Sequence, residues 1–250
     1  ILAVSKILLE SRAFTKEEMS GILNKLVAGC VPLENVKLVS ALVSNELFHY
    51  VELTHPVGIQ DKLWEIGCDI QQHHLMRIRY QRQGADAASA VERIVEPVSI
   101  LFSEYYFYLN AYITKENDGK YTRKYDYPAI FRIDRIADYK IMEQTFSLPY
   151  ASRFQEGEFR KRVQFMYPGR LQSIRLRYTG SSVEAILDRL PTAKIVSQDA
   201  NGYLVEAEIY GNGIVMWLLS QGNRVEVLAP QTLREEMFRV LTAMLERYQP

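Results

Sequence analysis

One stretch of the chain gathers aromatic side chains that carry polar ends. Residues 104–113 read Glu-Tyr-Tyr-Phe-Tyr-Leu-Asn-Ala-Tyr-Ile, and we expect the longest strand of the chain there. Strand alternation places an apolar set on one face, Tyr105, Phe107, Leu109, Ala111 and Ile113, and a polar-tipped set on the other, Tyr106, Tyr108, Asn110 and Tyr112. The first face predicts a core and the second a binding surface. The alternative is a barrel whose tyrosine hydroxyls simply reach water at the rim.

Arginines recur in the segments on either side of this strand. They are Arg77, Arg79, Arg93, Arg132 and Arg135. Arginine pairs with phosphate or carboxylate groups and stacks on aromatic rings, so arginine and tyrosine on a small barrel favour nucleotide or single-strand binding. The alternative is a solvated sheet face, on which Glu92, Glu96 and Asp134 supply surface ion pairs.

Other chemistries find no support in the sequence. His73 and His74 are adjacent rather than one helical turn apart, and neither Cys30 nor Cys68 belongs to a metal-binding pattern. The chain contains no G-x-S-x-G, P-loop or G-x-G-x-x-G motif, and no carboxylates are paired for acid–base work. We therefore predict that the protein is not an enzyme and that it uses no metal and no cofactor.

Composition narrows the class of protein. Thirty basic and thirty acidic residues give a formal net charge of zero, unlike a strongly basic nucleic-acid binder. Two cysteines in 250 residues point to a reducing compartment, and no apolar run is long enough for a membrane span. No signal peptide is visible, so we expect a cytoplasmic protein without a membrane partner. Ile1 opens directly into a helical pattern, which leads us to expect a further segment upstream.

The elements that would position these residues fall into an α+β order. Apolar residues at helical spacing predict four helices over residues 1–72, one of them opened by a capping box at Thr15 and Glu18. Alternating patterns then predict five short strands, at 75–80, 91–97, 104–113, 130–133 and 137–142, with the second ending at Pro97. Five short strands in about 70 residues indicate a small barrel, which we bound at 73–147.

The last part of the chain has a different layout. Residues 148–161 interrupt both periodicities and are predicted to be a linker. Residues 162–250 then alternate as β-α-β-β-α-β followed by a helix, which predicts a ferredoxin-like domain.

The tyrosine-rich strand resembles the signature of the WYL-domain family of bacterial transcription regulators. Phe107-Tyr108-Leu109 stands at the position of the Trp-Tyr-Leu triplet, with phenylalanine in place of tryptophan. The resemblance extends to the proline-led run 96–100, to Arg77-Ile78-Arg79-Tyr80, and to 131–136, Phe-Arg-Ile-Asp-Arg-Ile. Many members carry an arginine two residues before that phenylalanine, where this chain has Ala129. Residues 217–234 are similar to the family's C-terminal extension, and residues 1–72 to its helical connecting segment.

The resemblance implies an Sm-like (SH3-type) barrel that binds an effector, a homodimer, and DNA contacts through an N-terminal helix-turn-helix. We do not find that helix-turn-helix here, since the one candidate segment, 15–48, is too apolar and too poor in Lys and Arg to be a DNA-recognition element. We therefore predict the effector-sensing and dimerising part of a regulator that binds a nucleotide, a nucleic-acid strand or another anionic ligand. The predicted effector contacts are Arg77, Arg79, Arg93, Tyr106, Tyr108, Arg132 and Arg135. The competing hypothesis is a direct RNA or single-strand binder without a DNA-reading head.

Overall fold

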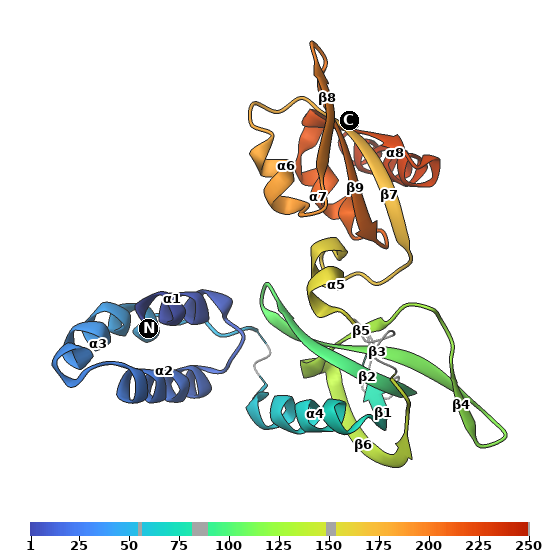
Figure 1. The fold of residues 1–250 in the computed structure, drawn as a ribbon. Coiled ribbons are helices and arrows are strands. Elements are labelled where there is room, and N and C mark those ends of the chain that lie inside the picture. Colours follow the sequence, from blue (N-terminus) through green and yellow to red (C-terminus); the bar gives the residue numbers. More distant parts are fainter. Residues whose placement is uncertain (55–56, 82–89, 149–153, 250) are drawn as a thin grey trace. The chain divides into compact units, whose positions relative to one another are not determined.

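The computed structural model describes residues 1–54, 57–81, 90–148 and 154–249 (Figure 1). The chain divides into two compact units. Unit 1 comprises Ile1–Thr122 and Phe131–Leu148, and unit 2 comprises Arg123–Ile130 and Pro149–Pro250. Both mix helices with antiparallel sheets, so the predicted α+β class is confirmed at that level. The boundaries of the four segments expected from the sequence stay a prediction. No helix among the described residues is long and apolar enough to cross a membrane.

Unit 1 begins with a helical part whose bounds follow the sequence pattern closely. Its helices are α1 (Leu2–Ser11), α2 (Lys16–Cys30), α3 (Leu33–Phe48) and α4 (Gln60–Gln72). The predicted capping box is present, because the Thr15 side chain accepts from the Glu18 N–H while the Glu18 carboxylate accepts from the Thr15 N–H. The same carboxylate accepts from the Ile59 N–H at 2.9 Å, which ties the start of α2 to the start of α4.

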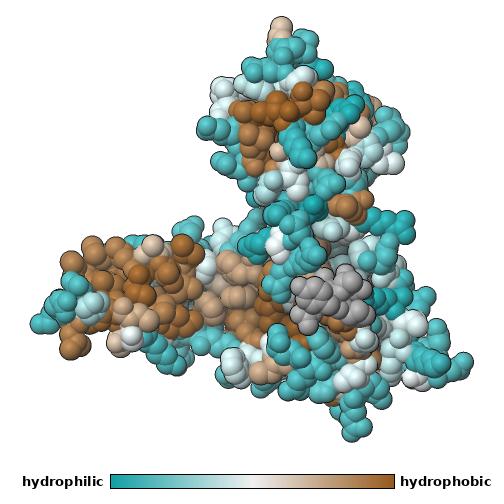
Figure 2. Space-filling model, in the orientation of Figure 1, coloured by the Kyte–Doolittle hydropathy of each residue, from teal (hydrophilic) through white to brown (hydrophobic). Residues whose placement is uncertain are grey.

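A small apolar cluster holds α1, α2 and α3 together. Its buried members are Leu9, Met19, Leu23, Val43 and Tyr50. Other large apolar side chains on these helices stay in solvent, including Leu33, Leu38 and Phe48. Figure 2 shows apolar residues gathered over this helical part.

Among the described residues the first sheet contains six strands rather than the five expected. They are β1 (His74–Tyr80), β2 (Val91–Ser103), β3 (Tyr106–Asn117), β4 (Lys120–Arg123), β5 (Ala129–Arg132) and β6 (Ile136–Thr145). The order is β4-β3-β2-β1-β6, with β5 also paired to β3. Among the described residues this sheet does not close, so the expected closed barrel is not present. The three-residue turn η2 (Ile133–Arg135) joins β5 to β6, but β5 pairs with β3 and β6 pairs with β1 at the other end of the strand order.

Two strand predictions need correction. The second strand does not end at Pro97: β2 continues to Ser103 and, at 13 residues, is longer than β3 at 12. Pro97 is tolerated because the pairing with β3 shifts register between Pro97 and Ser99, where a missing N–H costs little. The tyrosine-rich strand begins at Tyr106, since Glu104 takes a positive φ of 56° and turns the chain there.

Unit 2 is built on a four-stranded antiparallel sheet. Its elements are α5 (Glu156–Arg162), β7 (Leu171–Tyr178), α6 (Glu184–Arg189), β8 (Lys194–Asp199), β9 (Gly202–Tyr210), α7 (Ile214–Ser220), η4 (Gly222–Arg224), β10 (Val225–Ala229) and α8 (Gln231–Glu246). The sheet order is β10-β7-β9-β8. Within the segment predicted as a linker, residues 149–153 lie outside the described residues, and α5 occupies most of the remainder.

The core of unit 2 lies between one face of this sheet and the helices. Ile174, Leu176 and Tyr178 on β7 alternate inward and pack with Val205 and the other inward residues of β9. Side chains from α6, α7 and α8 complete the cluster, among them Ile186, Trp217 and Leu233. The intervening strand residues therefore point to the opposite face of the sheet.

Candidate functional site

Three of the predicted site residues come together in unit 1. The guanidinium carbon of Arg132, at the end of β5, lies 3.3 Å from the centre of the Tyr106 ring on β3. The Tyr106 and Tyr108 rings are neighbours, with centres 6.4 Å apart and planes nearly perpendicular. Strand alternation explains this pairing, because residues two apart on β3 share a face. The result is a cation stacked on one aromatic ring and flanked by a second.

Asp134 completes this group from the turn η2. Its carboxylate accepts a fork of hydrogen bonds from Arg132, Nε to Oδ1 at 3.1 Å and Nη2 to Oδ2 at 2.5 Å. Both side chains are about one-fifth exposed. The fork neutralises Arg132 while leaving the group partly open to solvent, so an incoming anion would compete with Asp134 for the guanidinium. We call Tyr106, Tyr108, Arg132 and Asp134 the tyrosine–arginine cluster.

Burial and neighbouring charges shift the pKa values of Tyr108 and Arg132 in opposite directions. Partial burial raises the pKa of Tyr108 to about 12, against a smaller lowering effect of the Arg132 charge. Burial is the largest influence on the pKa of Arg132 and acts to lower it, but the hydrogen bonds that Arg132 donates to Asp134 and the neighbouring negative charge together outweigh burial, so the pKa is raised. At neutral pH Tyr108 is therefore a neutral phenol and Arg132 a cation.

The remaining predicted arginines do not join the cluster. Arg77 on β1 is ion-paired to Glu92 at 2.7 Å with both side chains well exposed, as the surface-pair interpretation expected. Arg93 donates to the Glu92 carbonyl. The side chains of Arg79 and Arg135 make no hydrogen bond or ion pair within the described ranges. The assignment of these four residues to effector binding stays a prediction.

Two polar residues behave differently from the sequence-based interpretation. Asn110 was expected on the polar-tipped binding face, yet it is fully buried, because its amide donates to the Ser99 hydroxyl across the β2–β3 pair at 2.9 Å. Glu96 was expected in a surface ion pair, but it is only 7% exposed. Both lie in the central part of the sheet, where a polar side chain needs a local partner.

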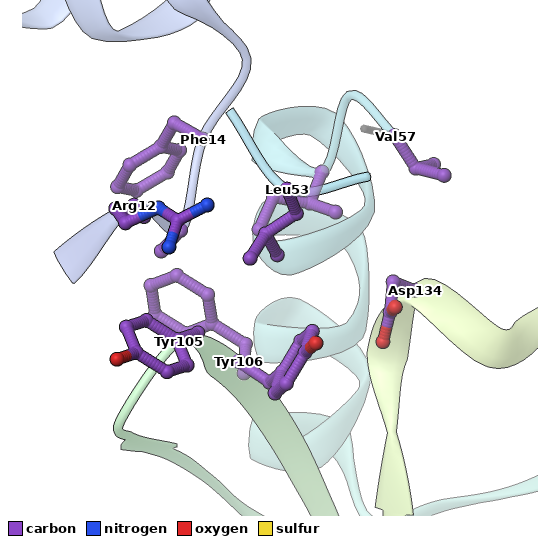
Figure 3. A pocket seen from close by; sticks show the side chains of 10 residues that line it. Arg12, Phe14, Leu53, Val57, Tyr105, Tyr106 and Asp134 are labelled. Carbon is purple, nitrogen blue, oxygen red and sulfur yellow. The ribbon is translucent and has the colours of Figure 1, made fainter. Parts of the chain in front are cut away.

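A small pocket adjoins the cluster and brings in residues that the sequence did not single out. Tyr106 lines it from β3, Tyr105 from the turn before β3 and Asp134 from η2. Arg12 and Phe14 line it from the segment after α1 (Figure 3). Its enclosed space is only about 20 Å³, roughly one water molecule. Arg12 donates to the Val51 and Glu52 carbonyls and lies over the Tyr105 ring at 5.5 Å. Nothing in the sequence around Arg12 predicted this, because the contacts arise from segments about 40 and 90 residues away.

No group of three or more histidine, cysteine or acidic side chains in the described parts of the chain is placed to hold a metal ion. The groups at the cluster are suited to binding an aromatic anion: rings for stacking and a guanidinium for an oxyanion.

The fold and the cluster define an α+β protein with an arginine–tyrosine binding surface on its first sheet. The family model of the WYL domain matches residues 69–141, and that of the WCX domain matches residues 170–245. The chain belongs to the WYL-domain family, and its WCX domain accompanies the WYL domain in regulators of that family. All seven predicted effector residues fall inside the WYL match, whereas Arg12 lies outside it.

The solved structures that are similar to this chain include the following two. The proteasome accessory factor B/C (PafBC) of Arthrobacter aurescens is 20% identical, with a TM-score of 0.40, over 95% of this chain and 36% of that chain. A CRISPR Cas-related protein is 17% identical, with a TM-score of 0.46, over 75% of this chain and 52% of that chain. The chain thus spans about one third and one half of these two structures. No curated protein matches it.

Proposed function

We propose that this chain is the effector-sensing and dimerising part of a bacterial transcription regulator, and that the effector is a nucleotide or a single nucleic-acid strand. The observation that carries the proposal is the Arg132 guanidinium stacked 3.3 Å from the Tyr106 ring, beside Tyr108. A base can stack on Tyr108 or on the outer face of the Arg132 guanidinium, which the Tyr106 ring supports, while its phosphate pairs with the edge of the guanidinium. DNA binding would come from a helix-turn-helix outside these residues, and the proposal includes no catalytic step.

The fold supports this assignment. The order β5-β3-β2-β1-β6, with a single 3₁₀ turn between the last two strands, fits an Sm-like (SH3-type) barrel that is open at that seam. In unit 2 the order β10-β7-β9-β8 is that of a ferredoxin-like sheet, to which α8 is added. We also place the protein in the cytoplasm, where Cys30 and Cys68, both exposed and unpaired, would stay reduced.

Asp134 gives the site a built-in competitor. Because it occupies the guanidinium fork, an effector phosphate must displace it before Arg132 can bind that phosphate in the same way. Anions that bind more strongly than a carboxylate are therefore favoured, and phosphate is the biological anion that meets this condition most often.

The displaced carboxylate offers a route from the effector to the helical part. Asp134 and Arg12 line the same pocket (Figure 3), and Arg12 donates to the Val51 and Glu52 carbonyls, just after α3. An effector that moves the Asp134 carboxylate changes the electrostatic potential at Arg12. The contacts that Arg12 makes with the segment after α3 then change, and with them the arrangement of helices α1 to α3. Binding would then act by shifting a population between two arrangements of the regulator.

The proposal is tested by fluorescence anisotropy with a labelled single-stranded oligonucleotide. We expect saturable binding that falls about 10- to 100-fold in Arg132→Gln, the effect of losing a charge-assisted hydrogen bond. Arg160→Gln is the matched control, since it removes the same charge from an exposed arginine that lies outside the predicted effector set and has no ion pair among the described residues. Equal affinities for Arg132→Gln and the parent chain, or an equal loss in both variants, would contradict the site.

The second candidate, a direct RNA or single-strand binder, rests on the same stacked arginine, which needs no DNA-reading head to hold a strand. Codons upstream of Ile1 distinguish the two. A helix-turn-helix there supports the regulator. Its absence, together with a steep fall of affinity with salt, supports direct binding.

A further inference from the structure

A groove in unit 2 lies on the sheet face that the helices leave uncovered. Its volume is about 660 Å³, within the range of small-molecule sites. The core packs on the other face, against α6, α7 and α8. Helix α5 forms one wall, because Phe159 packs on Tyr210 with ring centres 5.2 Å apart and Arg162 binds Glu208 on β9.

The floor of the groove is a row of side chains that crosses all four strands. Ala229 on β10 pairs with Arg175 on β7, Arg175 with Glu206 on β9, and Glu206 with Lys194 on β8. Directly paired residues of antiparallel strands share a face, so two cations flank one carboxylate across the floor. Ala229 is small and leaves the β10 end of the row open.

Charge in the groove favours an anion. The lining carries four basic side chains, Lys161, Arg162, Arg175 and Lys194, and three acidic ones, Glu158, Glu206 and Glu208. Every one of these carboxylates is already ion-paired to a basic neighbour. By contrast, Lys194 makes no hydrogen bond or ion pair with any described residue, in a chain whose overall net charge is zero. Lys194 is therefore available to a ligand without any bond being broken.

The shape and chemistry of the lining narrow the ligand further. None of the described residues that line the groove is aromatic, so it offers no platform on which a base could stack. It does offer Ser173 and carboxylate oxygens, which hydrogen-bond well to hydroxyl groups.

We propose that this groove is a second ligand site, and that its ligand is a small polyhydroxylated phosphate ester of the sugar-phosphate class. The phosphate binds to Lys194, and Arg175 adds a second positive charge on the far side of Glu206. Glu206, Glu208 and Ser173 form hydrogen bonds with the hydroxyls of the ligand. The site is independent of the tyrosine–arginine cluster, and nothing in the effector proposal requires it.

The test is isothermal titration of the whole chain with glucose 6-phosphate, with glucose and inorganic phosphate as the two fragments. We expect glucose 6-phosphate to bind at least about tenfold more tightly than either fragment, since both halves of the groove contribute. Lys194→Gln and Arg175→Gln should each weaken it by about tenfold or more. The matched control is Arg177→Gln, which removes an ion-paired arginine two residues further along β7, outside the groove lining.

Three results would overturn the proposal. The first is a titration with glucose 6-phosphate that shows no saturable heat of binding up to about 10 mM, a concentration high enough to detect weak metabolite binding. Another is equal weakening by Arg177→Gln and Arg175→Gln, which would indicate attraction to general charge. The third is inorganic phosphate binding as tightly as the ester. Circular dichroism of each variant establishes that a loss of binding occurs in a folded protein.

Discussion

The two candidate sites of this protein use arginine in contrasting ways. In unit 1, Arg132 lies flat on the Tyr106 ring and is held by a single carboxylate from a three-residue turn. In unit 2, Arg162 is bonded to both Glu158 and Glu208 and supports a wall, while the exposed Lys194 stays unpaired within the described chain. An arginine alone therefore says little about a site, because its neighbours decide whether it recognises a ligand or braces the structure.

The two sites also differ in the kind of ligand that they suit. The first site presents aromatic rings and almost no enclosed volume, which suits a flat base lying on a surface. The second presents volume and charge without rings. The following changes act on one side of this comparison at a time, beginning with the largest expected effect.

Leu176→Ala should have the largest effect of these changes, because it should destabilise unit 2 without affecting oligonucleotide binding in unit 1. Leu176 is fully buried in the core of unit 2, and its truncation is expected to cost about 2–5 kcal/mol of that unit's stability. Denaturant unfolding followed by circular dichroism should show the unit 2 transition shifting to lower denaturant, while oligonucleotide affinity is retained in unit 1. If Leu176→Ala lowered oligonucleotide affinity as well as the stability of unit 2, the two units would not fold independently.

Tyr106→Leu should weaken oligonucleotide binding by about 1–3 kcal/mol, the range for losing one stacking contact, because it removes the ring on which Arg132 is stacked. Tyr106→Phe keeps the ring and should bind like the parent chain. Glucose 6-phosphate affinity should stay unchanged in both. Equal losses for leucine and phenylalanine in the anisotropy assay would assign the role to the hydroxyl instead of the ring.

Asp134→Asn should strengthen binding at the first site. Removing the charge that competes for Arg132 is expected to raise oligonucleotide affinity about two- to fivefold. Asp138→Asn on β6 is the control, as it removes the same charge from an exposed residue. If both variants gain equally, the effect is general electrostatics, and Asp134 does not gate the site.

Tyr108 should give the smallest effect, visible only at high pH. Because its pKa in the folded chain is about 12, above the ordinary 10, folding favours the protonated phenol. The stability it contributes is complete below pH 10 and is lost as pH rises from about 10 to 12. Tyr108→Phe should therefore show a shallower fall of the unfolding midpoint over that range. Tyr248→Phe, at an exposed tyrosine, should follow the parent chain.

Local signals predicted much of the fold. The capping box at Thr15 and the bounds of α3 follow from neighbouring residues, and so does the order in which helices and strands follow one another from β7 to α8 along the chain. The path of β2 through Pro97 was missed, because a bulge depends on the partner strand rather than on local sequence. Likewise β4 was missed, being a four-residue strand held only by its neighbour.

The candidate site was predicted only in part for the same reason. Residue types singled out Tyr106, Tyr108 and Arg132, since aromatic and guanidinium groups carry recognisable chemistry. The sequence could not reveal that Asn110 turns inward to Ser99, or that Arg12 reaches the site from α1, because both depend on contacts between distant segments.

The most direct test of the effector site is side-chain NMR of the chain titrated with a single-stranded oligonucleotide. Labelled tyrosine rings and arginine Nε groups report each site separately. We predict saturable shifts at Tyr106, Tyr108 and Arg132, with Arg175 in unit 2 unchanged. Absence of a saturable shift at Arg132, or shifts concentrated at Arg175, would contradict the account.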